Sequence, residues 1–281
     1  MSNIQITCDS ICDLSSELLQ KYGIVSLPLY VRVGDEEYLD GVNIDAETLF
    51  QKTAETGTLP KTSAVSIGGY CEYWKPYLDA GKEIVHITVS SHLSSCFQNA
   101  SFAAQECGRT YVIDSLNLSS AAGLLAIEAA IMAEEGKSAA EIAETLNERR
   151  NKLNASFVIE SMDYLAKGGR CSSVASFAAG LLKLRLCIGV IDGRMDVVKK
   201  YRGKTSAVLC EYVRDRLNAV KEADLSRIFI TDSGVSDEIY EKVKQTVLQC
   251  LPFAEVLRAR AGCTISSHCG PGTLGILFFE K

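Results

Sequence analysis

The chain has 281 residues, 47% of them hydrophobic, and carries a formal net charge of −6 at pH 7. This length allows two ordinary domains, and the apolar content excludes an intrinsically disordered chain. The basic residues form no cluster or stripe, which argues against a nucleic-acid-binding surface.

Targeting and membrane signals are weak in this sequence. The Met-Ser-Asn start has neither a basic nor an apolar signal-peptide region, so we expect no signal peptide and a cytoplasmic protein. Two long apolar stretches, 121–133 and 177–191, are interrupted by Glu128 and by Lys183 with Arg185. A spanning helix needs about 20 apolar residues, so we expect no transmembrane segment, while transient contact with a membrane surface stays open.

The eleven cysteines are scattered and include no C-x-x-C pair. In a chain of this size the pattern predicts reduced, mostly buried thiols rather than a disulfide framework. The three histidines and the dispersed cysteines have no zinc-like spacing, so we expect no metal. No Walker A or G-x-G-x-x-G motif is present, so we expect no nucleotide cofactor.

The first half of the chain alternates between strand and helix patterns. Strands are expected at 3–7, 24–33, 83–89 and 110–114, with a turn or hairpin at 34–41. A capped helix is expected at 15–23, and Asp45 is expected to cap a helix that ends at Gly57. Further helices are expected at 94–107, 119–136 and after a capping box of Ser138 and Glu141. Because Pro28 has no backbone N–H, the strand at 24–33 is expected to bend or to lie at a sheet edge. The alternation predicts an α/β domain with a mainly parallel sheet, which we place at 1–152.

A different pattern begins after about residue 152. Strands are expected at 155–160, 227–231, 254–260 and 274–280, and helices at 205–219 and 236–248. Two strand-like runs within 181–203 flank Asp192-Gly193, a dipeptide typical of a type I′ hairpin. These elements predict a second α+β domain at 153–281, although no linker composition marks the boundary.

Hydroxyl side chains gather where the predicted parallel strands end, which is where open α/β sheets bind ligands. The polar groups are Cys8-Asp9-Ser10, Ser90-Ser91 and Asp114-Ser115, with Thr62, Ser63 and Ser66 in the loop 60–66. Ser94 and Ser95 stand at a helix start, where backbone N–H groups and the macrodipole favour an anion. Each of these residues is also typical of a plain helix cap, but together they predict an anion-binding site.

The second half adds two polar residues beside glycines. Arg170 follows a glycine pair, and an arginine there could pair with an anion. His268 precedes Gly270-Pro271-Gly272, whose glycines would let a backbone approach a ligand. Either glycine run is equally typical of an ordinary turn, and a lone histidine is more often structural.

A serine hydrolase is the main alternative from another functional class. It would use Ser94 as the nucleophile, His268 as the base and Asp9 as the orienting carboxylate. The sequence contains no G-x-S-x-G nucleophile elbow, which weakens this hypothesis without removing it.

Considered together, these motifs resemble the DegV family of bacterial fatty-acid-binding proteins, which includes the acyl-carrying subunit of fatty acid kinase. The similarity runs from end to end, in order, through the following segments: CDSICDL (8–14), PL (28–29), YLDG (38–41), LPKTSAVS (59–66), SSHLSSCFQNA (90–100), IDS (113–115), MDYLAKGGRCSS (162–173), GLLKLR (180–185), KYRGK (200–204) and HCGPGTLG (268–275).

The resemblance implies a two-domain fold, with a mainly parallel N-terminal α/β domain, a smaller C-terminal α/β domain and a lipid tunnel between them. It implies a non-catalytic carrier in phospholipid metabolism, which presents a long-chain fatty acid to a separate kinase for phosphorylation to acyl phosphate. The family's carboxylate contacts fall on Thr62, Ser63 and Ser94, with Arg170 and His268 as nearby polar partners. Arg202 lies in the segment that resembles the kinase-docking surface.

Some family positions differ in this sequence. The usual LSGTY reads Leu93-Ser94-Ser95-Cys96-Phe97, so Ser95 replaces a glycine in the carboxylate pocket and is expected to narrow it. The usual TSQPS reads 62–66 as TSAVS, and TDS reads 8–10 as CDS. The hydroxyls remain, so carboxylate binding is still expected, while another apolar acid, such as a polyprenyl or branched acid, stays open as the ligand.

Overall fold

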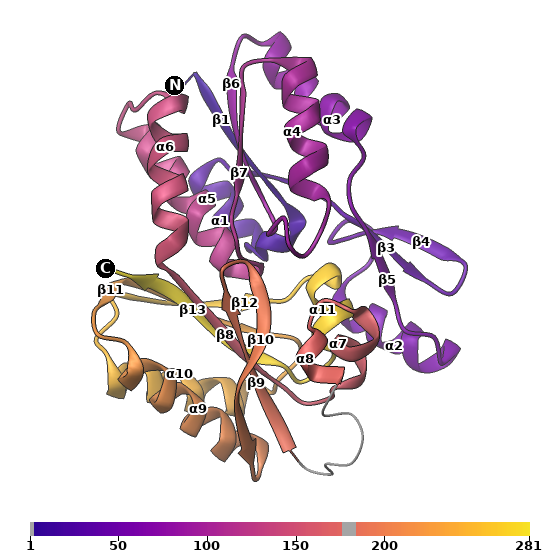
Figure 1. Ribbon diagram of the computed structural model, residues 1–281, viewed down its shortest axis with the longest axis vertical. Helices are drawn as coiled ribbons and strands as arrows, with labels where there is room; N and C mark the ends of the chain where they lie inside the picture. Colours follow the sequence, from indigo (N-terminus) through magenta and orange to yellow (C-terminus); the bar gives the residue numbers. More distant parts are fainter. Residues whose placement is uncertain (1–2, 176–183) are drawn as a thin grey trace.

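The computed structural model describes residues 3–175 and 184–281. Most of the GLLKLR motif (180–185), and the start of the strand-like run predicted from 181, lie outside the described residues. Within the described residues the strands form three sheets, and α-helices cover their faces (Figure 1).

A parallel four-stranded sheet forms the core of the first half. Its strand order is β2-β1-β6-β7, with β1 at Ile4–Asp9, β2 at Val25–Leu27, β6 at Glu83–Thr88 and β7 at Thr110–Asp114. The helices of this half are α1 (Ser16–Tyr22), α3 (Ile67–Asp79), α4 (Cys96–Cys107), α5 (Ser119–Glu134) and α6 (Ala139–Arg149). The prediction of a mainly parallel sheet here is confirmed.

Helix α5 joins this sheet to the second one. It is apolar on all sides, and such a helix is stable only when it is buried. It packs against β1 and β6 of the first sheet and against β8, β11 and β13 of the second. A short 3-10 helix, Ser10–Cys12, follows β1, and a second, Arg150–Lys152, follows α6 before the second half begins.

The second half forms a six-stranded mixed sheet in the order β10-β9-β8-β13-β11-β12. Its strands are β8 (Leu153–Ile159), β9 (Leu184–Ile191), β10 (Arg194–Arg202), β11 (Ala223–Asp232), β12 (Glu255–Arg260) and β13 (Leu274–Glu280). Helices α9 (Thr205–Ala219) and α10 (Asp237–Cys250) cover its outer face (Figure 1). The predicted fold class is therefore confirmed, whereas the division into domains at residue 152 stays a prediction.

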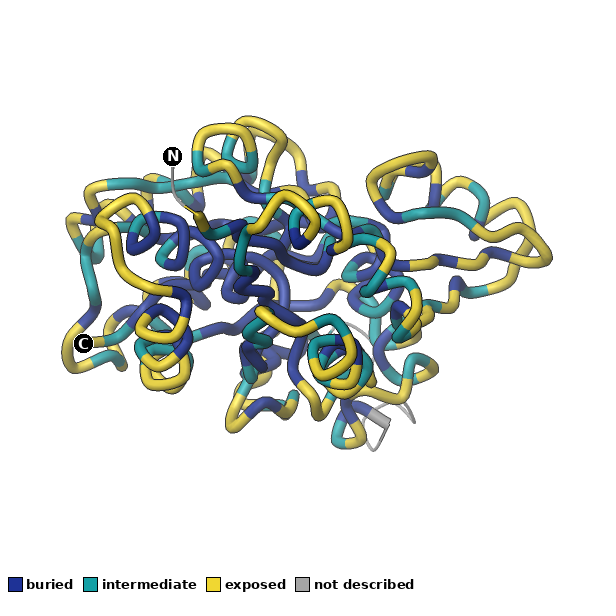
Figure 2. Tube along the Cα trace, turned by 90° about the horizontal axis from the view of Figure 1, so that it is seen from above, coloured by how far each residue is buried: buried dark blue, intermediate teal, exposed yellow. Residues whose placement is uncertain are grey.

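A small antiparallel sheet, β4-β3-β5, protrudes from the body together with α2 (Figure 1). Its strands are β3 (Tyr30–Val33), β4 (Glu36–Leu39) and β5 (Lys61–Ser63), and α2 spans Ala46–Thr56. Figure 2 shows the buried residues in the middle of the molecule and exposed residues along this protrusion. The segment 24–33 lies at a sheet edge and bends at Pro28, as expected: β2 is the edge strand of the parallel sheet, and proline cannot continue its hydrogen-bonded ladder. It forms two strands rather than one, because the chain continues into the small sheet as β3.

Several local signals formed as expected. Ser15 caps α1 and Asp45 caps α2, each accepting a hydrogen bond from a first-turn N–H. The capping box of Ser138 is present at the start of α6. Asp192 and Gly193 have φ angles of 47° and 77°, which is the type I′ geometry predicted for the β9–β10 hairpin.

Three short helices lie near the junction of the two halves. They are α7 (Asp163–Gly168), α8 (Ser172–Ala175) and α11 (Cys263–Cys269). Helix α11 comes from the second half but packs against α2, β3 and β5 of the first. It therefore brings a C-terminal segment to the loops that follow the N-terminal strands.

Candidate functional site

A cavity of roughly 320 Å³ lies between the six-stranded sheet and the loops of the first half, within the size range of small-molecule sites. All six predicted ligand-binding residues line it: Thr62, Ser63, Ser94, Ser95, Arg170 and His268. The rest of the lining is mainly apolar, including Ile11, Leu29, Val89, Leu93, Leu118, Phe157, Leu165, Met195, Ile265 and Leu277. The structure thus places the sequence-predicted residues around one space, with side chains from both halves of the chain.

Two hydroxyl loops form one side of the cavity. Thr62 and Ser63 end strand β5, and Ser94 with Ser95 immediately precedes helix α4. The side chain of Asn99 donates to the carbonyl of Val65 at 2.7 Å, which ties α4 to the end of the other loop. The hydroxyls of Ser63 and Ser95 have no hydrogen-bond partner among the described residues.

Ser94 already has a local role. Its Oγ accepts a hydrogen bond from the backbone N–H of Cys96 at 3.3 Å and lies 3.2 Å from the Cys96 sulfur. This hydroxyl therefore helps to start α4, and it makes no hydrogen bond with His268 in the described part of the chain. The single hydrogen of this hydroxyl points to the Cys96 sulfur, a weak acceptor, so a carboxylate at Ser94 would replace that sulfur as the acceptor.

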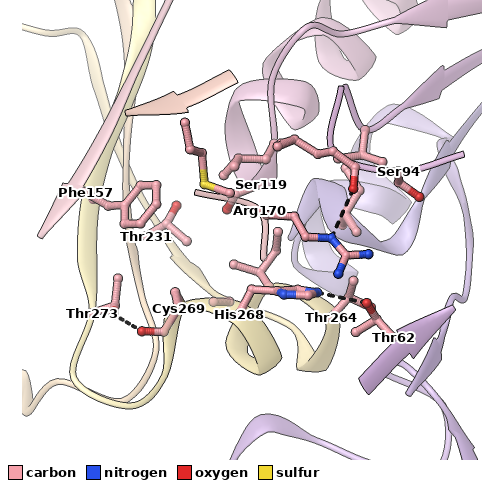
Figure 3. A pocket seen from close by; sticks show the side chains of 18 of the residues that line it. Thr62, Ser94, Ser119, Phe157, Arg170, Thr231, Thr264, His268, Cys269 and Thr273 are labelled. Carbon is pink, nitrogen blue, oxygen red and sulfur yellow. Dashed lines mark hydrogen bonds between the residues drawn. The ribbon is translucent and has the colours of Figure 1, made fainter. Parts of the chain in front are cut away.

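His268 connects the two halves of the site. Its Nε2 lies 2.9 Å from the Thr62 hydroxyl, a contact between residues 206 positions apart (Figure 3). Helix α11 is held at its other end by Asp40, whose carboxylate accepts hydrogen bonds from the N–H groups of Cys263 and Thr264 at 2.7 and 3.1 Å. Asp40 thereby satisfies two of the free N–H groups that every helix start exposes.

The imidazole of His268 is neutral at physiological pH. Burial first, and then the nearby Arg170 charge, lower the pKa of His268 to about 4. Its Nδ1 is buried without a hydrogen-bond partner among the described residues. We assign the proton to Nε2, because an unpaired buried N–H is rarer and more costly than an unprotonated nitrogen. The Nε2–H then donates to Thr62, and the Thr62 hydroxyl keeps its own hydrogen for a ligand.

Two glycines near His268 are required by close packing. A Cβ at Gly168 would lie 2.7 Å from Nδ1 of His268, so only glycine lets α7 approach this ring. Gly270 has a φ of 74°, and a Cβ there would lie 2.7 Å from the Tyr164 ring. Both glycine motifs noted in the sequence therefore shape the surroundings of His268.

Arg170 supplies a positive charge at the same side of the cavity. Its Nη1 donates to the Gly168 carbonyl at 2.7 Å, and its Nε donates to the Leu93 carbonyl at 3.4 Å. Among residues 3–175 and 184–281 no carboxylate forms an ion pair with it. The guanidinium is thus oriented by backbone carbonyls and keeps donors for an anion.

The opposite side of the cavity carries Thr231 and Thr273, whose hydroxyls the sequence did not indicate (Figure 3), and Ser233 also lines the cavity. Thr231 bonds with the hydroxyl of Ser120 at 2.5 Å, Ser233 donates to the Gly270 carbonyl at 2.5 Å, and Thr273 donates to the Cys269 carbonyl at 2.8 Å. These hydroxyls are occupied within the protein, so the side chains chiefly offer carbon atoms to the cavity.

The polar residues at the strand ends do not line the cavity, contrary to the expectation from the sequence. Asp9 accepts hydrogen bonds from Tyr70 at 2.9 Å and lies 3.2 Å from Nε2 of His86 in the core. Ser90 donates to the Gly193 carbonyl of the β9–β10 hairpin at 2.8 Å. Because Asp9 is committed to His86, the contacts give the Ser94–His268–Asp9 hydrolase arrangement no support.

Arg202 lies elsewhere, at the exposed end of β10, and does not line the cavity. No described helix is both long and apolar enough to cross a bilayer. In the same residues, no group of three or more His, Cys, Asp or Glu side chains is placed to hold a metal ion.

Comparison with known proteins identifies relatives of the whole chain. Residues 3–281 match a family model described as "Uncharacterised protein, DegV family". The chain belongs to the DegV family. A fatty acid-binding protein of Thermotoga maritima is 30% identical, and the match covers 97% of this chain and 96% of that relative.

Solved structures of DegV family proteins have the same fold. One from Thermus thermophilus, described by its fatty acid binding, is 28% identical and superposes with a TM-score of 0.88 over 100% of both chains. A stearic acid-binding protein from Eubacterium ventriosum is 25% identical, with a TM-score of 0.87 over 99% of this chain and 98% of that one. The family resemblance seen in the sequence is therefore confirmed.

Proposed function

We propose that this protein binds a long-chain fatty acid in the cavity and presents its carboxylate to a separate kinase. Thr62, Ser63, Ser94 and Ser95 would donate hydrogen bonds to the carboxylate, and Arg170 would balance its charge. His268 would act through Thr62, by holding that hydroxyl with its hydrogen free for the ligand. The protein would then be a carrier with no catalytic residue of its own.

The observation that carries this proposal is the uneven use of polar groups around the cavity. On one side the Ser63 and Ser95 hydroxyls have no described partner, and Arg170 has no carboxylate. On the other side the hydroxyls of Thr231 and Thr273 are bonded within the protein. A ligand with one anionic end and a long apolar remainder matches this distribution, and a fatty acid has that form.

The energetics divide in the same way. Burying about 14 methylenes contributes on the order of 11 kcal/mol at ~0.8 kcal/mol each, before the cost of association. A hydrogen bond to a charged group contributes about 1.5–3 kcal/mol. The tail therefore supplies most of the affinity, and the hydroxyls orient the head group and select against neutral lipids. The descriptions of the Thermus thermophilus and Eubacterium ventriosum relatives support the same ligand class.

Mass spectrometry of the purified protein under denaturing conditions tests the proposal directly. We expect a co-purified acid whose mass corresponds to a linear long-chain fatty acid, and uptake of oleate or palmitate by delipidated protein. Lipid-free protein that also takes up neither acid would refute the proposal. A polyprenyl or branched acid in the extract would keep the carboxylate site but replace the ligand.

Presentation to a kinase is the second part of the proposal. Arg202 is exposed on β10 and separate from the cavity, so it is free to contact a partner protein. Release of acyl phosphate when a fatty acid kinase catalytic subunit and ATP are added is the expected result. Absence of that product with lipid-loaded protein and an active kinase would limit the function to binding.

A further inference from the structure

Cys71 and Cys107 form an unusual contact outside the cavity. Cys71 lies in the second turn of α3, Cys107 is the last residue of α4, and their sulfur atoms are 2.9 Å apart. A disulfide bond is about 2.05 Å long, so a shift of roughly 0.9 Å would bring the two atoms to bonding distance. Both residues are partly accessible to solvent.

We propose that Cys71 and Cys107 are a redox modification site, at which a reversible disulfide covalently joins α3 to α4. The oxidant would be a small-molecule disulfide, such as oxidised glutathione. The thiolate of one cysteine attacks the oxidant, forms a mixed disulfide and releases one thiol. The second cysteine then displaces the other thiol, so that two electrons and the two cysteine protons pass to the oxidant.

The surroundings distinguish this pair from the other cysteines in the described residues. Cys8 and Cys12 also interact, but both are buried in the core and closed to an oxidant. Cys210 and Cys250 are also partly accessible, and neither forms a hydrogen bond with another cysteine among the described residues. Cys71 and Cys107 therefore combine a neighbouring thiol with access from solvent, which are the two geometric conditions for disulfide exchange.

The reaction is expected to be slow. Burial, the Cys107 thiol and the nearby Glu106 carboxylate raise the pKa of Cys71 to about 12, so this cysteine is protonated at neutral pH. Since the thiolate is the reacting form, the pair would respond to sustained oxidation rather than act as a fast exchange catalyst. Reversible disulfides in reducing compartments commonly have such a sensing role.

The location links the disulfide to the cavity. Helix α3 follows the loop of Thr62 and Ser63, and α4 follows Ser94 and Ser95. A covalent link between these helices would limit separation of the two hydroxyl loops and slow the release of a bound carboxylate. This consequence rests on the proposed function, whereas formation of the disulfide does not.

Peptide mapping tests the disulfide without any ligand. Reduced protein is incubated with oxidised or reduced glutathione, alkylated, digested without reduction and analysed by mass spectrometry. We expect a cross-linked Cys71–Cys107 peptide only after oxidation, two fewer alkylated thiols, and full reversal by dithiothreitol. Cys210→Ser should behave as the wild type, whereas Cys71→Ser or Cys71→Ala should leave a glutathione adduct on Cys107.

Persistent glutathione adducts on Cys71 or Cys107 of the wild type, or unchanged alkylation of all cysteines, would overturn the proposal. Circular dichroism confirms that each variant is folded, and either substitution at Cys71 suffices for the comparison. Release of a fluorescent fatty acid is then compared in oxidised and reduced protein. We expect oxidation to slow release of the fatty acid from the wild type but not from Cys71→Ser. If the disulfide is mapped in the wild type and oxidised and reduced protein release the acid at equal rates, only the link to the cavity is refuted.

Discussion

Ser63 offers a clean test of the carboxylate site. Its hydroxyl lines the cavity, is exposed and makes no hydrogen bond within the described residues, so Ser63→Ala should leave the folded protein unchanged. Ser66, in the same loop, provides a matched control. Its Oγ accepts a hydrogen bond from Gly69 N–H at 3.1 Å and caps α3, but it does not line the cavity.

The expected magnitudes follow from these contacts. Loss of one hydrogen bond to a carboxylate costs about 1.5–3 kcal/mol, and the solvent exposure of Ser63 places the effect near the lower end. Because 1.4 kcal/mol corresponds to a tenfold change, Ser63→Ala should weaken fatty acid binding about tenfold. Ser66→Ala should instead lower stability by about 1 kcal/mol through loss of the helix cap, with unchanged affinity.

Competition against a fluorescent fatty acid on delipidated protein provides the affinity, and urea unfolding provides the stability. Co-purification alone is too insensitive, because the tail supplies on the order of 11 kcal/mol and keeps lipid bound to the variant. The methyl ester of the same acid should lose less affinity than the free acid on Ser63→Ala. Equal affinity of the wild type and Ser63→Ala for the free acid would show that Ser63 does not bind the carboxylate.

Three further predictions concern pH and the partner surface. Burial raises the pKa of Asp13 to about 8, so its contribution to stability is present below about pH 4 and is lost as pH rises through 8. In Asp13→Asn the amide oxygen can still accept from the Gly262 N–H, and the amide N–H can donate to the Ser119 hydroxyl. Urea unfolding of this variant should therefore show a smaller loss of stability between these pH values. The pKa of His268 is lowered to about 4, so the free energy of unfolding should fall as pH drops from about 6.5 to 4. The fall should be smaller in His268→Gln, and an equal fall in the wild type and the variant would contradict burial of His268 as a neutral imidazole. Arg202→Ala should bind fatty acid like the wild type but yield less acyl phosphate with a kinase and ATP. A loss of lipid affinity in Arg202→Ala as large as that in Ser63→Ala would contradict separate binding and docking roles.

Local signals in the sequence predicted much of the fold. Caps at Ser15 and Asp45 and the turn at Asp192-Gly193 depend on neighbouring residues only, and all three formed as expected. The segment 24–33, predicted as one bent or edge strand, forms two strands, because periodicity continues across Pro28 while the two parts join different sheets. Periodicity describes which residues are buried, but sheet membership depends on partners distant in sequence.

Helix α11 shows why the site was harder to predict than the fold. Its seven residues include two serines, a threonine and a histidine, which are modest helix formers, and no side chain caps it from within. Asp40 supplies that cap from 223 residues away. The hydroxyls of Thr231 and Thr273 were missed for a similar reason, because strand patterning shows burial without showing which face meets a cavity.

The contacts at His268 make ligand binding and the packing of the two halves interdependent. Thr62 comes from the first half, His268 from the second, and Asp40 holds the helix that carries His268 against the first. A ligand that needs Thr62 and Arg170 together can bind only when the halves are assembled. By linkage, such a ligand stabilises the assembled state, with a gain that grows as its concentration exceeds its dissociation constant. Under the proposed function, a bound fatty acid should therefore raise the stability of the junction formed by Thr62, His268 and Asp40.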